Sequence, residues 1–153
     1  MTTASQKPIS LWPIYLVVGG AIAALMIWAM RSTLANTPSR DATADFGPYG
    51  LVTIRLTTDP YPPLPTGTVR LSFMPMDSRQ RPVPLDSLQF EYGRQGSDVI
   101  VGSGRAESMA DGSGMFIAGA QVPQVGNWWL RVRVVKGGEQ AQVRYTLYVK
   151  PAQ

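Results

Sequence analysis

Hydrophobic and polar positions follow two different patterns along this chain, and the second pattern begins near residue 49. Residues 11–30, LWPIYLVVGGAIAALMIWAM, are free of charged side chains. From residue 49 onward, apolar and polar residues alternate with a period of two, which is typical of strands that bury one face. Neither pattern is present over 31–48. We therefore expect an N-terminal tail over 1–10, a helix over 11–30, a linker over 31–48 and a folded domain over 49–150.

The uncharged segment predicts a single transmembrane helix. Twenty residues in a helix extend for about 30 Å, which matches the hydrocarbon region of a bilayer. Trp12 and Trp28 lie near its two ends, where aromatic rings settle at the headgroup level. The alternative is a cleaved signal peptide ending near Thr33-Leu34-Ala35, but this segment is longer than the roughly 7–15 apolar residues of such a signal. We expect a single-pass protein of the cell membrane, in contact with the lipid bilayer, with its C-terminal domain outside the cytoplasm.

Small residues are concentrated in the middle of this segment. They form two pairs spaced four positions apart, a spacing that lets two helix backbones approach closely in lipid. The candidate residues for contact with another membrane helix are Gly19, Gly20, Ala23 and Ala24. The alternative is that they are only the glycine and alanine found in any single span.

The alternating part of the chain predicts an all-β domain. Clusters rich in Pro, Gly and Asp separate the apolar and polar alternations, as expected for tight turns between strands. The candidate strands are 52–57, 68–73, 88–92, 98–103, 115–122, 127–136 and 140–149. Seven strands in about 100 residues favour an immunoglobulin-like Greek-key β-sandwich.

The last two candidate strands assign the two faces of this domain. Gly137 and Gly138 between them suit a tight hairpin turn, and alternation then places Trp128 and Tyr145 on the apolar core face. Aromatic and arginine side chains gather on the opposite face, a composition that is enriched in protein interfaces. The residues that we expect to be outward and to bind a partner are Trp129, Arg131, Arg133, Arg144 and Tyr148. The alternative is a solvated strand face with one exposed tryptophan.

The composition excludes most catalytic chemistry. The chain has no His and no Cys, so it lacks disulfides, thiolate and imidazole metal ligands, Cys nucleophiles and His acid-base catalysts. Its three lysines fall in the tail, a hairpin and the C-terminus, which leaves Ser–Lys catalysis without a buried lysine. We expect no enzymatic activity, no cofactor and no small-molecule substrate. The net charge of +4 comes from scattered arginines, so nucleic-acid binding is not expected either.

Methionine supplies the remaining soft metal-binding group. Met74 and Met76 form a Met-x-Met pair, and Met109 and Met115 follow in a later loop and strand. Thioether sulfur is a soft ligand that suits Cu(I). Because methionine commonly fills gaps in packed structure, packing is the favoured interpretation, with Met74 and Met76 as the candidate metal ligands.

Two stretches of the chain resemble a known family. They are GTVRLSFMPMDSRQRPVP and DGSGMFIAGAQVPQVGNWWLRVRV, the second containing Gly114/Phe116 and Gly126/Trp128/Leu130/Val132. With the N-terminal span, they resemble the membrane-anchored YtkA-like and FixH-like immunoglobulin-type domains over about residues 50–150. The resemblance implies exposure outside the cytoplasm and an association with respiratory oxidases or copper handling, although relatives that bind metal tend to offer histidine.

These observations predict a non-catalytic accessory subunit of an integral-membrane complex. We favour a complex of respiratory or photosynthetic electron transfer, whose subunits the chain would bind through its helix and its extracytoplasmic domain. Two alternatives stay open: a membrane-anchored copper-handling protein, and an adhesion or cell-wall binding module on a membrane stalk.

Overall fold

The computed structural model describes residues 18–27, 39–65 and 67–151. The chain divides into two compact units, Met1–Thr37 and Pro38–Gln153. In the first unit, residues 18–27 are helical. No helix within the described residues has both the length and the apolar character needed to cross a membrane. The prediction of a transmembrane helix over 11–30 therefore has no support in the described part of the chain, and residues 11–17 and 28–30 lie outside it.

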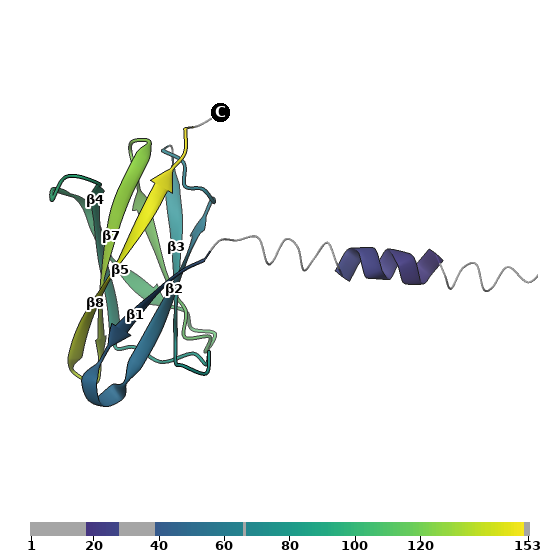
Figure 1. Ribbon diagram of the computed structural model, residues 1–153, viewed down its shortest axis with the longest axis horizontal. Coiled ribbons are helices and arrows are strands. Elements are labelled where there is room, and N and C mark those ends of the chain that lie inside the picture. The colour runs from purple at the N-terminus through teal and green to yellow at the C-terminus, as the bar shows by residue number, and fades with distance from the viewer. Residues whose placement is uncertain (1–17, 28–38, 66, 152–153) are drawn as a thin grey trace, which may run out of the picture. The chain divides into compact units, whose positions relative to one another are not determined.

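The second unit is an antiparallel β-structure, so the prediction of an all-β domain is confirmed. Over the described residues, its eight strands have the order β1-β2-β3-β6-β5-β4-β7-β8. Figure 1 shows these strands gathered in one β-domain. The strands are β1 (Arg40–Asp45), β2 (Leu51–Asp59), β3 (Thr68–Met76), β4 (Ser87–Arg94), β5 (Ile100–Ser108), β6 (Phe116–Gln121), β7 (Gly126–Lys136) and β8 (Glu139–Val149), with a short 3-10 helix η1 (Gly47–Tyr49) after β1.

The sheet bends into two four-stranded halves around one core. β5 and β6 join the halves through only two register pairs, Glu107 with Ile117 and Ser108 with Phe116. At the other end of the strand order β1 contacts β8, so the sheet almost closes on itself. The halves β1-β2-β3-β6 and β5-β4-β7-β8 thus each present one outer face.

The first strand corrects the predicted boundary between linker and domain. β1 lies within residues 31–48, which we expected to form a linker, and it pairs along its whole length with β2. Its inward residues include Ala42 and Ala44, whose small side chains make the alternation weak in the sequence. On its outer side, Asp41 forms an ion pair with Arg55 of β2 at 3.0 Å. The domain therefore begins before residue 49 and has one strand more than the seven predicted.

Aromatic residues fill the centre of the core and fasten the two halves together. The rings of Phe90 and Tyr92 stack with their centroids 6.3 Å apart. The Tyr92 hydroxyl donates to the carbonyl oxygen of Gln121 at 2.9 Å and accepts from its amide at 3.1 Å, where β5 and β6 diverge. The Tyr145 hydroxyl donates to the carbonyl oxygen of Ile54 at 2.7 Å, which links β8 to β2. These bonds hold the outer faces at fixed positions.

Candidate functional site

Alternation assigned the two adjacent tryptophans of β7 to the correct faces. Trp128 belongs to the hydrophobic core, whereas Trp129 lies outside that cluster, on the outer face of the half β5-β4-β7-β8. Its neighbours in register there are Gly93 of β4 and Thr146 of β8. Arg131, Arg133, Arg144 and Tyr148 lie on the same outer face, as predicted.

The expected exposure of Trp129 was wrong, because its side chain is only 1% exposed. A Cβ atom on Gly93 would collide with the indole, so the absence of a side chain at Gly93 leaves the space that the ring occupies beside β4. The indole nitrogen donates to the carbonyl oxygen of Ser97 at 2.8 Å, in the turn between β4 and β5. The guanidinium carbons of Arg131 and Arg144 lie 5.1 and 5.7 Å from its ring centroid. Trp129 is thus buried beneath two arginines and presents almost no surface of its own.

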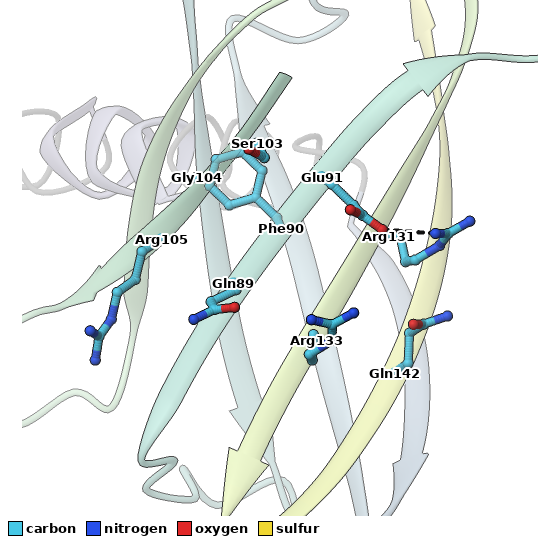
Figure 2. Close-up of a pocket in the computed structure, with 9 residues that line it drawn as sticks. All are labelled: Gln89, Phe90, Glu91, Ser103, Gly104, Arg105, Arg131, Arg133 and Gln142. Atoms are coloured by element: carbon cyan, nitrogen blue, oxygen red, sulfur yellow. Dashed lines mark hydrogen bonds and ion pairs between the residues drawn. The ribbon is translucent and has the colours of Figure 1, made fainter. Parts of the chain in front are cut away.

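A hollow of about 360 Å³ lies on the half β5-β4-β7-β8, and its lining includes Arg131 and Arg133 of β7 (Figure 2). Two rows of cross-strand neighbours cross this face, and all of their residues except Arg144 line the hollow. The first row runs Arg105, Gln89, Arg133 and Gln142 across β5, β4, β7 and β8, and the second runs Ser103, Glu91, Arg131 and Arg144. We call the four arginines of these rows, Arg105, Arg131, Arg133 and Arg144, the arginine face.

Positive charge is in excess on the arginine face. Glu91 is the only acidic residue among those that line the hollow, and its carboxylate binds the Arg131 guanidinium at 2.8 Å (Figure 2). Within the described part of the chain, the other three arginines form no ion pair. Guanidinium groups bind carboxylates in a bidentate geometry. The face is therefore suited to an anionic ligand.

The hollow does not contain the groups of a catalytic centre. Its lining offers one hydroxyl, Ser103, and no histidine or lysine that could activate it. Across residues 18–27, 39–65 and 67–151, no group of three or more His, Cys, Asp or Glu side chains could hold a metal ion. The arrangement supplies charge and hydrogen-bond donors around a hollow in the strand surface.

Sequence reasoning found only part of this face. Arg131, Arg133 and Arg144 follow from alternation along the last hairpin, but Arg105 and Glu91 lie on strands far from it in the sequence. Their place beside β7 depends on the strand order β5-β4-β7, which no local pattern specifies. Tyr148 is 51% exposed on β8 but does not line the hollow.

The other candidate residues lie elsewhere. Gly19, Gly20, Ala23 and Ala24 are exposed within the helical residues 18–27, and their contact with a membrane helix stays a prediction. Met74 and Met76 line a second hollow on the outer face of the half β1-β2-β3-β6.

Comparison with known proteins gives no relative for this chain. No family of known proteins, no curated protein and no solved structure matches it. The resemblance to YtkA-like and FixH-like domains accordingly stays a prediction.

Proposed function

We propose that this chain is a non-catalytic binding subunit that docks an acidic protein surface on its arginine face. The observation that carries the proposal is the excess of guanidinium groups on the arginine face, where Arg105, Arg133 and Arg144 form no ion pair within the described residues. In the finer form of the proposal, the domain is immunoglobulin-like, and the partner belongs to an integral-membrane complex of respiratory or photosynthetic electron transfer.

Rigid presentation supports a docking role. All four arginines project from paired strands, and two of them are held over the Trp129 ring. A side chain that is already ordered loses less conformational entropy when a partner binds. Arginine also binds carboxylates with fixed geometry, unlike the more flexible lysine.

The membrane part of the proposal rests on the sequence. The uncharged residues 11–30 have the length of a bilayer span. The small residues at 19, 20, 23 and 24 have the spacing that permits close helix contact in lipid. The helix and the arginine face would then give the subunit two separate contacts with one complex.

Co-purification of charge-reversal variants tests this function. The full chain is extracted from native membranes in mild detergent, and the proteins that remain bound are identified and quantified. We expect a stoichiometric integral-membrane partner with the wild type, and its loss with Arg133→Glu. Arg70→Glu is the matched control, because Arg70 is an exposed strand arginine on the other half of the sheet.

Three results would contradict the proposal. The first is a wild-type chain that retains no partner, and the second is equal retention by Arg133→Glu and Arg70→Glu. The third is binding to isolated cell-wall polymer in place of a membrane protein, which would favour an adhesion module.

A further inference from the structure

Three methionines from separate parts of the sequence meet on the outer face of the half β1-β2-β3-β6. Met74 and Met76 are two positions apart on β3 and therefore project to the same side. Met115 directly precedes Phe116, which pairs with Phe73, so Met115 occupies the register position opposite Met74. All three line a hollow of about 270 Å³, which we call the methionine hollow.

We propose that Met74, Met76 and Met115 form a three-thioether site for Cu(I). The site is independent of the arginine face, which lies on the other half of the sheet.

Local backbone bonds hold the segments that carry these side chains. After Met76 the chain turns back, with the Asp77 amide donating to the Arg81 carbonyl oxygen at 2.9 Å, and Pro82 forms a bridge with Met76. On the other side, the Met115 carbonyl oxygen accepts from the Met109 amide at 2.8 Å, and the Met115 amide donates to the Ser113 hydroxyl at 3.2 Å. The backbone is therefore held in place on both sides of the hollow where Met76 and Met115 attach.

The burial of the three methionines shows which of them serve to fill space in the fold. Met76 is 8% exposed beneath the 77–82 turn, as expected for a residue that fills a gap. Met74 and Met115 are half-buried on the outer face. Their chain neighbours Phe73 and Phe116 point to the other face, into the core, so the two methionines fill no space in the core. Packing accounts for one of the three methionines and leaves two thioethers open to a ligand.

The chemistry of the hollow favours a soft monovalent ion. Thioethers are neutral, soft ligands that select Cu(I) over hard or borderline cations. The remaining lining residues are Arg55, Thr57, Ser72, Gln80 and Pro82. None of them is a carboxylate, which Mg²⁺ and Ca²⁺ require.

Arg55 is the one charged group in the lining, and its charge is balanced. Its Nε donates to Asp41 Oδ1 at 3.0 Å and its Nη2 to Asp41 Oδ2 at 3.1 Å. This bidentate contact places the Asp41 carboxylate against the guanidinium and offsets its positive charge beside the hollow. An ion with a single positive charge is also repelled less by a nearby cation than a divalent ion is.

Metal competition on the full chain in detergent micelles tests the site. Copper is kept as Cu(I) by ascorbate under argon and is titrated against bicinchoninate, whose colour reports the metal that the protein does not hold. We expect one Cu(I) per chain. Met74→Leu and Met115→Leu should each weaken binding at least about tenfold, because leucine keeps the volume and removes the sulfur. Met109→Leu is the matched control, since Met109 is adjacent in the fold but does not line the hollow.

A second measurement needs no variant. With methionine methyl groups labelled with carbon-13, addition of Ag(I), a redox-inert probe of Cu(I) sites, should shift the resonances of Met74, Met76 and Met115 and leave that of Met109 unchanged. The proposal is overturned if the wild type takes up no Cu(I), if the three-leucine variant binds as well as the wild type, or if Met109→Leu weakens binding equally. Shifts spread over all methionines would also overturn it.

Discussion

At the residue scale, two adjacent tryptophans show what alternation does and does not determine. Period two assigned Trp128 and Trp129 to opposite faces of β7, and the structure agrees. Alternation could not show that Trp129 is buried on the outer face. Its burial depends on the space left by Gly93 and on the turn that contains Ser97. Both depend on how β4 lies beside β7, a contact between segments that are distant in the sequence.

Burial of both tryptophans predicts that both matter for folding. Trp128→Ala and Trp129→Ala should both destabilise the domain, because removing a buried tryptophan costs about 3–5 kcal/mol. Urea unfolding of the full chain, followed by near-ultraviolet circular dichroism, measures both variants. A Trp129→Ala protein with the wild-type midpoint would show that the outer tryptophan contributes little to the fold.

At the element scale, strands were predictable where large apolar residues alternate with polar ones. β3, β7 and β8 follow from such patterns, since their inward residues are Val, Leu, Phe, Trp and Tyr. β1 was missed because alanines occupy its inward positions and because β2, on which it depends, supplies the pairing. The contact of β5 with β6 through two register pairs could not be predicted from the sequence either, because it joins the two halves of the sheet.

A hydrogen bond between distant strands gives a prediction at this scale. Tyr145→Phe removes the 2.7 Å bond from β8 to the carbonyl oxygen of Ile54 on β2 and leaves that oxygen buried. We expect a loss of about 1–3 kcal/mol in the free energy of unfolding. Tyr148→Phe is the control on the same strand, because its side chain is 51% exposed and its loss should have little effect. Equal unfolding midpoints for the two variants would contradict this assignment.

The same tyrosine predicts how stability depends on pH. Burial raises the pKa of Tyr145 above its ordinary value, with a smaller contribution from Asp41. Above about pH 10 the unfolded chain loses this proton while the folded chain keeps it, so the free energy of unfolding falls as pH rises. Unfolding measured between pH 8 and pH 11 should show that fall in the wild type and a smaller one in Tyr145→Phe. A wild-type curve no steeper than that of the variant would be inconsistent with a buried neutral hydroxyl.

At the scale of the whole molecule, each half of the sheet presents different chemistry on its outer face. The half β5-β4-β7-β8 presents guanidinium groups, and the half β1-β2-β3-β6 presents thioethers. Sequence patterns supplied three of the four arginines and the Met74/Met76 pair. They could not place Arg105 beside Gln89, or Met115 opposite Met74, because strand order and register determine both neighbours.

Salt separates the two contacts that the proposed function assigns to the chain. Docking on the arginine face depends on charge, and the Debye length shortens from about 10 Å at 0.1 M salt to about 3 Å at 1 M. Partner recovered with the detergent-extracted chain should therefore fall as NaCl is raised over this range, and it should fall less steeply for an Arg105→Glu chain that has already lost part of the attraction. The proposed contact between membrane helices through Gly20 would depend on close packing, so salt should leave it unchanged. If recovery is unchanged at 1 M NaCl but is lost with Gly20→Leu, the helix alone carries assembly and the arginine face is not the docking surface.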